Sequence, residues 1–449
     1  MTGKRILVVG AGFGGFYSAM HLRRAAQLGH RVTVVNPENF MQYNPFLPEV
    51  ASGTIDPRAV TVPMRWVLRH CDIVIGEVQR VDHDRRVAIV RLIDEREVEI
   101  EYDIVILAPG SWSRVLPIPG LAEHGVGFKT VQEAIWLRNH VLSRLDVAAA
   151  TTDPERRRAA LTFVFVGGGY AGVEALGELE DLARDALKSY PNVRPEEMRW
   201  IVVEAAGGIL PELGRDLAEY AVERLGRRGI EVLLNTRLDS AEGRVIRLSD
   251  GQVFPADTLV WTAGVKPSPL AAESGFPVDE TGRIRTDAFL RVEGVEDAWA
   301  SGDAAAVPDV IAGGVMPPTA QHGMRQGKAL ADNLVAELEG DRLLPFEYRG
   351  IGSVASLGRY KGVAVIFGVR LKGFAAWFLH RTYHLYAMPT LTRKVKIAAD
   401  WTVALLFPRD LAQLGSFENP REPFVRAAAR KTSSGRARAS RSAKATDRG

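Results

Sequence analysis

Two glycine-rich turns are the segments of this 449-residue chain whose residue types and spacing are best suited to chemistry. Each turn follows a short apolar run and precedes a run with helical patterning. Their glycines are Gly10, Gly12 and Gly15 in the first turn, and Gly167, Gly169 and Gly172 in the second. In such a turn one glycine allows the tight bend, one lets a pyrophosphate approach the backbone, and one lets the helix pack on the strand. The two turns therefore predict two dinucleotide-binding βαβ units.

The residue that ends the second strand of each unit bears on cofactor choice. Asn36 ends that strand in the first unit, and Glu204 ends it in the second. A carboxylate there accepts hydrogen bonds from a ribose diol and repels a 2′-phosphate. Because no Lys or Arg stands among residues 205–208, the second site is expected to prefer NADH to NADPH. Asn36 can bond a ribose without the usual charge, and Glu38 is an alternative partner.

Three further strand ends carry small or acidic residues. Gly110 follows the apolar run 102–108, and Gly264 follows the run 258–263. Gly302 and Asp303 follow a third run at 295–301, where a carboxylate can bond a polyol chain. A surface turn is the alternative explanation of Asp303.

In this order, the elements resemble the two-dinucleotide-binding flavoprotein oxidoreductases, and residues 4 to 415 are similar to the type II NADH dehydrogenases. The segments 43–53 (YNPFLPEVASG) and 317–321 (PPTAQ) support the likeness. The resemblance implies an α/β fold with two Rossmann-like dinucleotide-binding domains, the FAD domain being interrupted by the NADH domain, and a C-terminal amphipathic membrane-surface segment. It places FAD at the first glycine turn and NADH at the second. The residues implied around FAD include Asn36, Gly110, Gly302, Asp303 and Ala320, and those around NADH include Glu204 and Gly264.

The activity implied by the resemblance is hydride transfer from NADH to FAD, followed by two-electron transfer to a membrane quinone without proton pumping. Gln321 is the residue implied to face the quinone. The family usually has a second glutamine four residues later, where this chain has Arg325 followed by Gln326. This departure leaves a non-quinone acceptor open, and two rival functions follow: a soluble NADH-dependent diaphorase and a non-enzymatic NADH-sensing flavoprotein.

Glu174 lies in the first turn of the helix that follows the second glycine turn. Its place beside the expected nicotinamide site makes it the candidate for orienting the reactants or handling protons. The alternative explanation is a first-turn acid that the helix macrodipole favours.

Length and composition indicate several globular domains and exclude some classes of site. At about 150 residues per domain, the length suggests three units. We expect an FAD-binding domain at 1–120 and 275–345, an NADH-binding domain at 121–274, a membrane-association region at 346–420 and a disordered basic tail at 421–449. Cys71 is the only cysteine, which excludes a disulfide relay, and the nine histidines lack metal-ligand spacing, so no metal is expected.

The C-terminal part of the sequence predicts a protein surface that binds a membrane. Residues 371–408 contain two helix-like stretches separated at Pro389, with charges too frequent for a spanning helix. Their mixture of aromatic and basic residues is typical of helices that lie on an anionic membrane surface, although a homodimer interface or a core helix pair is the alternative. Residues 421–449 hold nine Lys or Arg and two Asp or Glu, a balance of +7. With no signal peptide at the start, we expect a peripheral protein on the cytoplasmic face of the membrane and no nucleic-acid partner.

Overall fold

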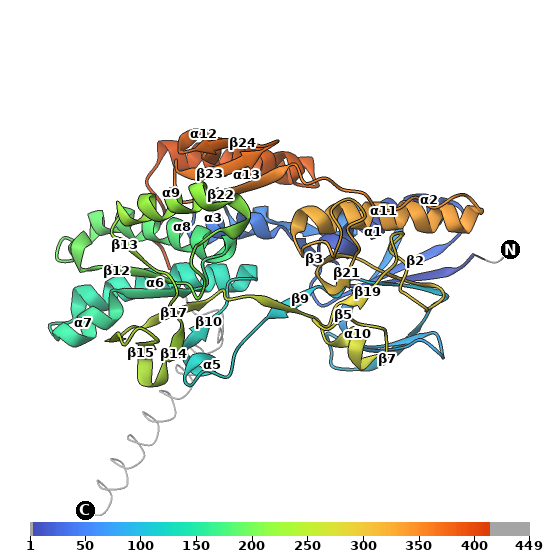
Figure 1. The fold of residues 1–449 in the computed structure, drawn as a ribbon, viewed down its shortest axis with the longest axis horizontal. Coiled ribbons are helices and arrows are strands. Elements are labelled where there is room, and N and C mark those ends of the chain that lie inside the picture. Colours follow the sequence, from blue (N-terminus) through green and yellow to red (C-terminus); the bar gives the residue numbers. More distant parts are fainter. Residues whose placement is uncertain (1–2, 414–449) are drawn as a thin grey trace, which may run out of the picture. The chain divides into compact units, whose positions relative to one another are not determined.

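The computed structural model describes residues 3–413 and contains two sheets of mainly parallel strands, each with its own helices (Figure 1). The seven-stranded sheet takes its strands, in spatial order, from β20 (Ala298–Ala300), β8 (Ile104–Leu107), β1 (Arg5–Val9), β2 (Arg31–Asn36), β5 (Cys71–Asp82), β6 (Val87–Leu92) and β7 (Glu97–Glu101). The strands from β20 to β5 are parallel, and β6 and β7 extend the sheet as an antiparallel meander. Every residue of β8 is buried, as expected for a strand covered on both faces.

The five-stranded sheet is wholly parallel. Its strands, in spatial order, are β10 (Gly125–Val126), β17 (Thr258–Trp261), β11 (Thr162–Val166), β12 (Arg199–Val203) and β13 (Ile230–Leu233). An antiparallel sheet accompanies it, formed by β14 (Leu238–Ser240), β15 (Val245–Leu248) and β16 (Val253–Pro255). Both expected βαβ units are therefore present, each with a parallel strand pair around the glycine turn.

Helices surround the two sheets. Those associated with the larger sheet are α1 (Phe13–His21), α2 (Arg23–Gln27), α4 (Met64–Val67), α10 (Leu270–Glu273) and α11 (Ala320–Glu339). The other half contains α5 (Leu121–His124), α6 (Val131–Ala150), α7 (Pro154–Ala160), α8 (Tyr170–Ala186) and α9 (Arg215–Gly226). The short helix α3 (Leu47–Ala51) packs against α6 and α8, so a segment between β3 (Phe40–Gln42) and β4 (Thr61–Pro63) reaches the second half.

Two of the connections between the halves pair with each other. β9 (Ser111–Ser113) follows β8, and β18 (Val265–Pro267) follows β17. They form an antiparallel two-stranded ribbon that lies between the halves in Figure 1. After the second crossing, β19 (Ile284–Arg285) and β21 (Ala305–Ala306) pair in parallel beside the larger sheet.

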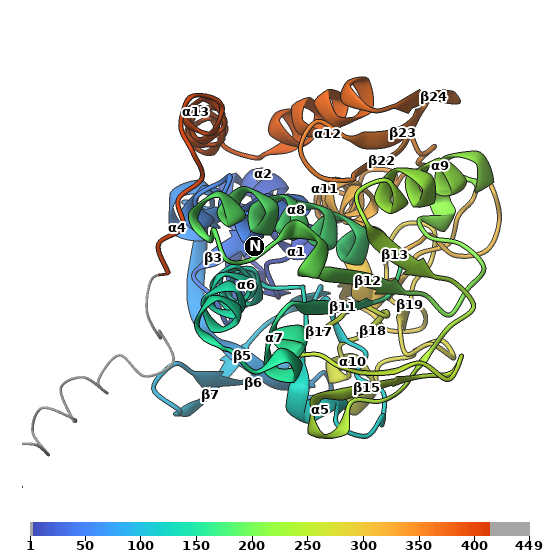
Figure 2. The same cartoon turned by 90° about the vertical axis from the view of Figure 1, so that its left-hand side faces the viewer.

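The C-terminal region is more than the pair of helices expected from the sequence. It begins with an antiparallel sheet of β22 (Gly352–Ser356), β23 (Gly362–Ile366) and β24 (Val369–Lys372). The helices α12 (Phe374–Ala387) and α13 (Leu391–Leu406) follow and are separated at Pro389, as predicted. All five elements lie along the top in Figures 1 and 2. Residues 410–449 form a separate unit, and the predicted disordered tail at 421–449 lies outside the described residues.

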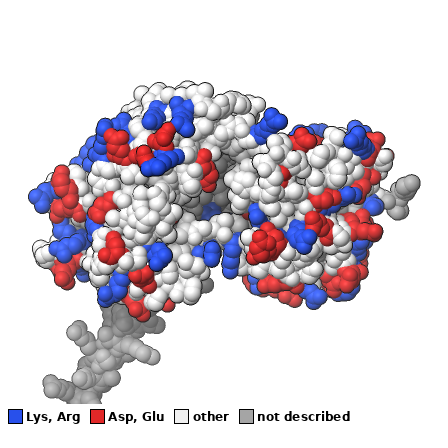
Figure 3. Space-filling view, in the orientation of Figure 1, with Lys and Arg blue, Asp and Glu red and all other residues white. Residues whose placement is uncertain are grey.

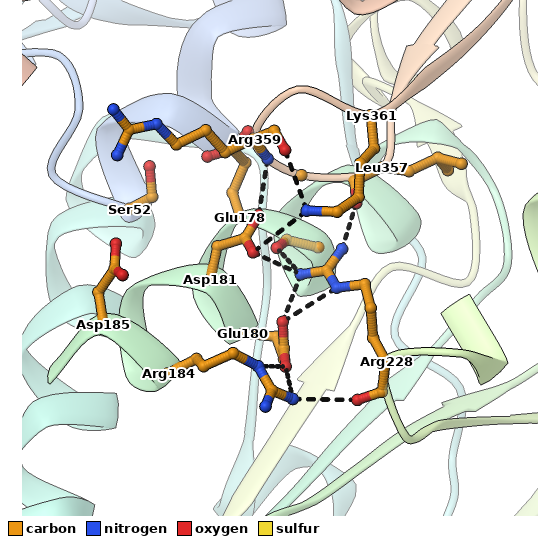
Figure 4. Close-up of polar contacts among 12 residues, drawn as sticks. Ser52, Glu178, Glu180, Asp181, Arg184, Asp185, Arg228, Leu357, Arg359 and Lys361 are labelled. Carbon is orange, nitrogen blue, oxygen red and sulfur yellow. Dashed lines mark hydrogen bonds and ion pairs between the residues drawn. The ribbon is translucent and has the colours of Figure 1, made fainter. Parts of the chain in front are cut away.

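A buried ion-pair network attaches this C-terminal sheet to α8 (Figure 4). Arg228 forms ion pairs with Glu180 and, at 3.0 Å, with Asp181, and it donates hydrogen bonds to the carbonyl oxygens of Gly177 and Leu357. The Glu180 side chain is fully buried, and that of Arg228 is 10% exposed. Because Leu357 lies in the β22–β23 turn, Arg228 joins three segments that are distant in sequence.

Replacing Arg228 with Ala is expected to lower the stability of the protein strongly. The substitution removes a buried donor shared by Glu180, Asp181 and two carbonyl oxygens, although Glu180 keeps Arg184 and Asp181 keeps Lys361. The loss is therefore expected at the lower end of the about 3–5 kcal/mol that breaking a buried pair costs. In a unit of this size, 3 kcal/mol corresponds to roughly 6–12 °C in melting temperature. Thermal unfolding followed by circular dichroism measures the shift.

Arg227→Ala is the matched control, because the neighbouring Arg227 side chain, at the C-cap of α9, is 63% exposed and pairs with Glu223 of that helix. An exposed pair of this kind contributes about 0.3–0.5 kcal/mol. Equal melting temperatures for the two variants would show that the network does not hold the sheet in place.

Candidate functional site

The first glycine turn has the geometry of a phosphate site. Gly10 has φ +87°, and a Cβ on Gly15 would lie only 2.0 Å from the Gly10 carbonyl oxygen. A Cβ on Gly12, in contrast, would meet no atom within 4 Å. Gly10 and Gly15 therefore allow the bend and the close packing of α1, whereas Gly12 faces open space at the N-terminus of that helix. A dinucleotide pyrophosphate requires this combination.

The second turn repeats this arrangement. Gly167 has φ +116°, and a Cβ on Gly172 would lie 2.2 Å from the Gly167 carbonyl oxygen. A Cβ on Gly169 would again meet nothing within 4 Å. The N-terminus of α8 is thus open to an anion in the same way as that of α1.

Asn36 and Glu204 occupy equivalent positions beside the two turns. The Asn36 Oδ1 accepts a hydrogen bond from the backbone N–H of Ala11 at 2.8 Å. The Glu204 carboxylate accepts one from the N–H of Gly168 at 2.6 Å and one from the N–H of Ala206 at 2.7 Å. Each side chain is therefore held at its glycine turn, and only Glu204 brings a negative charge. A cavity of about 170 Å³ that Gly10 and Asn36 help to line adjoins the first turn, where the adenosine end of FAD would lie.

Asp303 lies with two residues that the sequence motifs did not indicate. Its carboxylate accepts a hydrogen bond from the Ser111 hydroxyl at 2.6 Å, and Lys129 Nζ donates to that hydroxyl at 2.5 Å. Burial lowers the pKa of Lys129, and the charge of Asp303 opposes this. Ser111 directly follows the predicted Gly110. Lys129 belongs to no motif, and only the folded chain brings it to this site.

Helix α11 is fixed against α1 by a close approach of glycines. A Cβ on Gly327 would lie 2.4 Å from the Gly14 carbonyl oxygen, and a Cβ on Gly323 would lie 3.0 Å from Phe13 Cβ. This packing brings the first residues of α11, Ala320 and Gln321, beside the first glycine turn. Gly302 is part of the same region, since its N–H donates to Gln326 Oε1 at 2.8 Å.

The Gln321 carboxamide is oriented by two neighbours. Tyr348 Oη donates to its Oε1 at 2.9 Å, and its Nε2 donates to the Gly352 carbonyl oxygen at 3.4 Å. Arg325 donates to the Gln321 carbonyl oxygen at 3.0 Å, and its guanidinium lies 4.3 Å from the centroid of the Tyr348 ring. Arg325 thus occupies the place of the expected second glutamine and packs around the first.

Glu174 is buried, with 6% of its surface exposed, and it connects α8 to the C-terminal region. Its Oε1 accepts a hydrogen bond from the Ser356 N–H at 2.8 Å and lies 3.1 Å from His380 Nε2. Burial lowers the pKa of His380, but the hydrogen bond and charge of Glu174 outweigh this and raise it. Glu174 was expected in the first turn of this helix, but α8 begins at Tyr170 and its first turn contains no acid. Attraction to the helix N-terminus therefore does not explain a carboxylate with these partners.

His380 and its neighbours were not predicted from the sequence. The rings of His380 and His384 are 4.6 Å apart, and His384 Nδ1 lies 3.1 Å from the Tyr43 hydroxyl. Burial lowers the pKa of His384 far below its usual value and raises that of Tyr43. Tyr43 in turn packs edge-on against Phe13, 5.6 Å between centroids, so the chain of polar groups leads from Glu174 to the first glycine turn.

The described part of the chain gives little support to metal-dependent chemistry or to a reactive thiol. Within residues 3–413, no three His, Cys, Asp or Glu side chains are grouped so as to hold a metal ion. Burial raises the pKa of the Cys71 thiol to about 12, which makes it a poor nucleophile at neutral pH.

Gly110 and Gly264 have φ +73° and +96° at the carboxyl ends of β8 and β17, with open space beside them.

Comparison with known proteins agrees with these features. Residues 4–327 match the pyridine nucleotide-disulphide oxidoreductase family. The chain is 31% identical to a type II NADH:quinone oxidoreductase of Mycobacterium tuberculosis, over 90% of this chain and 89% of that protein. It is 30% identical to a demethylphylloquinone reductase of Synechocystis, over 88% and 95% of the two chains.

A solved structure shares the fold. NDH2 from Plasmodium falciparum, determined in complex with NADH, superposes with a TM-score of 0.85 at 18% identity, over 91% of this chain and 99% of that one. The chain belongs to the pyridine nucleotide-disulphide oxidoreductases and, within them, to the type II NADH:quinone oxidoreductases.

Proposed function

We propose that this protein oxidises NADH with FAD as its cofactor and passes two electrons to a membrane quinone, without pumping protons. The duplicated turn geometry carries the proposal, because Gly12 and Gly169 both face open space at a helix N-terminus. We assign FAD to the domain formed by 1–120 and 275–345, and NADH to 121–274. The strands of the seven-stranded and five-stranded sheets fall within these two sets of residues.

The chemistry of hydride acceptance comes from FAD when it is bound, so the chain has to bind and orient the reactants. The N-termini of α1 and α8 would bind the two pyrophosphates, and Asn36 and Glu204 would bind the ribose diols. The Ser111 hydroxyl and Lys129 hold Asp303 at the carboxyl end of β20, where its carboxylate would bond the ribityl chain. Space-filling atoms leave a hollow between the two halves, where the nicotinamide would meet the flavin (Figure 3).

At the acceptor end, Gln321 is the residue proposed to contact the quinone. Tyr348 and the Gly352 carbonyl fix its carboxamide before any acceptor arrives. Arg325 keeps a positive charge one helical turn further on, where it would favour an anionic form of the acceptor.

The buried chain from Glu174 to Tyr43 is proposed to supply the protons that a quinone takes up on reduction. Glu174 raises the pKa of His380, so this imidazole can hold a proton out of contact with solvent. His384 has a lowered pKa, its ring centroid is 4.6 Å from that of His380, and its Nδ1 is 3.1 Å from the Tyr43 hydroxyl. No hydrogen bond joins the two imidazoles within the described residues, since His380 Nδ1 has no partner there, so a proton would pass between them through a bound water. Glu174 therefore acts through His380, as a positioning residue for the proton.

Purified protein is expected to oxidise NADH with short-chain quinone analogues, and Glu174→Gln is expected to lose about 100-fold in that rate, the scale of a general acid–base contribution. Flavin reduction by NADH, followed anaerobically by stopped flow, should be largely unchanged. Because Glu174 raises the pKa of His380, the variant should also shift the corresponding limb of the pH–rate profile to lower pH.

Glu178→Gln is the matched control, since Glu178 is equally buried one turn along α8 and bonds the Ser356 hydroxyl rather than His380. Equal losses in the two variants, with no shift of the pH profile, would mean that Glu174 is only structural. Turnover with soluble acceptors alone would favour a diaphorase. Flavin reduction without turnover on any acceptor would favour an NADH-sensing flavoprotein.

Glu204 is proposed to select NADH over NADPH. The double variant Glu204→Ala with Ala205→Arg removes the carboxylate and adds a cation next to it, so a 2′-phosphate is no longer repelled. The ratio of kcat/KM for NADH to that for NADPH is expected to fall by about tenfold or more, since 1.4 kcal/mol corresponds to tenfold. Ala205→Arg alone is the control, and an unchanged ratio in the double variant would exclude Glu204 as the residue that reads the ribose.

The surface formed by α12 and α13 is proposed to bind an anionic membrane. None of the described helices is long and apolar enough to cross a bilayer. Large apolar side chains are nevertheless exposed here, and the upper edge in Figure 3 is largely without charged residues. The most exposed on α13 are Leu391 at 76%, Leu406 at 73% and Leu405 at 61%. Because NADH is an intracellular reductant, we place this surface on the cytoplasmic face.

Replacing Leu405 and Leu406 with Glu is expected to lower partitioning into phosphatidylcholine–phosphatidylglycerol vesicles by about tenfold or more, since each buried Leu contributes about 1.5–3 kcal/mol. Vesicle sedimentation measures the effect, with FAD content as the folding check. Ile93→Glu is the control, because Ile93 is 82% exposed in the β6–β7 turn, far from α13 in Figures 1 and 2.

Unchanged vesicle binding of the double variant would contradict the membrane proposal. If the double variant also changed from dimer to monomer in sedimentation velocity, the surface would instead be a homodimer interface.

A further inference from the structure

Arg393, in the first turn of α13, is a buried cation without a partner. Only 7% of its surface is exposed. Its backbone N–H donates to Thr390 Oγ1, but its guanidinium forms no hydrogen bond or ion pair with any residue between 3 and 413. A guanidinium has five N–H donors, and burying a charge without a partner is costly. The N–H donors of this side chain are therefore free to meet an acceptor that binds beside it.

Arg393 is one of the residues that line a cavity of about 290 Å³ between α4 and the start of α13. Arg69 contributes a second cation to the same cavity, and it too lacks an ion pair within the described chain. Thr390 and Thr392 add hydroxyl groups from the first turn of α13. The first N–H groups of a helix have no partner within it and carry partial positive charge, so this end of the 16-residue helix adds to the cationic character.

Two acids lie near this cavity and are already engaged. The Asp56 carboxylate accepts hydrogen bonds from the N–H and guanidinium of Arg58, at 2.8 to 3.2 Å. Asp400 accepts a hydrogen bond from the Asp56 N–H at 3.0 Å. Burial lowers the pKa of Arg393 and the charge of Asp56 opposes this, yet neither acid comes within ion-pair distance of the guanidinium.

The remaining wall of the cavity is apolar. Pro63, Val67 and Trp66 line it, and the Trp66 side chain is 64% exposed. Leu391 and Val395, on the same end of α13, are 76% and 60% exposed. An anion that binds here would thus have apolar groups beside it, which suits a phosphate that carries acyl chains better than a free one.

We propose that this cavity binds a phosphate ester, supplied by the headgroup of an anionic phospholipid, with Arg393 and Arg69 as its cationic partners. The proposal rests on the proposed membrane association and adds a defined headgroup site to it. Arginine suits this role because its planar donors match phosphate oxygens in pairs.

The test uses monomeric lipid, so that it does not depend on vesicle binding through Leu405 and Leu406. Full-length holoenzyme is titrated with dihexanoyl-phosphatidylglycerol below its micelle concentration, and binding is followed by ³¹P line broadening. Saturable binding is expected, at least about tenfold weaker in Arg393→Gln and weakened in Arg69→Gln. Inorganic phosphate is expected to bind more weakly than the lipid.

Arg215→Gln is the matched control, because Arg215 lies in the first turn of α9 and is 88% exposed. Arg69 is exposed, so its variant keeps the test valid even if Arg393→Gln were poorly folded. No saturable binding, or equal binding by wild type and both cavity variants, would overturn the proposal. If inorganic phosphate bound with the same affinity as the lipid, the proposal that a lipid headgroup supplies the phosphate would be wrong.

Discussion

The close contact between helix and strand at each glycine turn determines much of the architecture around it. At Gly15 and Gly172 a side chain would overlap a carbonyl oxygen of the same turn, so only glycine allows α1 and α8 to start this close to the strand before them. Helix α11 then packs on α1 through Gly327, and its first turn carries Gln321. The position of Gln321, the residue proposed to face the acceptor, is thus set through two helices by glycines.

Local sequence signals were sufficient for the fold class and the family, because each of them lies within one strand, turn or helix start. The glycine turns and strand ends are of this kind, and comparison with known proteins confirmed the family that they indicated. The roles of Gln321, Glu174 and the other site residues stay predictions. The sheet of β22–β24 was not predicted because its strands lack the alternation of a half-buried strand: the buried positions of β22 and β23 lie together at one end, and β24 has none.

Residues that meet only in the folded chain could not be found from sequence. Lys129 precedes a helix cap and gives no sign of Asp303, and His380 lies in an aromatic helix that suggested only a surface role. For Glu174, the sequence left two explanations open. As an expected first-turn acid it fitted attraction to the helix dipole as well as proton handling, whereas in the structure it lies beyond the first turn of α8 and contacts His380.

The ribbon of β9 and β18 has a mechanical consequence for the reaction. Two crossings that are hydrogen-bonded to each other resist sliding past one another, and the packing of α3 on α6 and α8 joins the halves at a second place. Hydride transfer requires reacting atoms about 3–3.5 Å apart and in register. Two separate connections would keep the halves in the same lateral alignment at each turnover, while one nucleotide is exchanged for another.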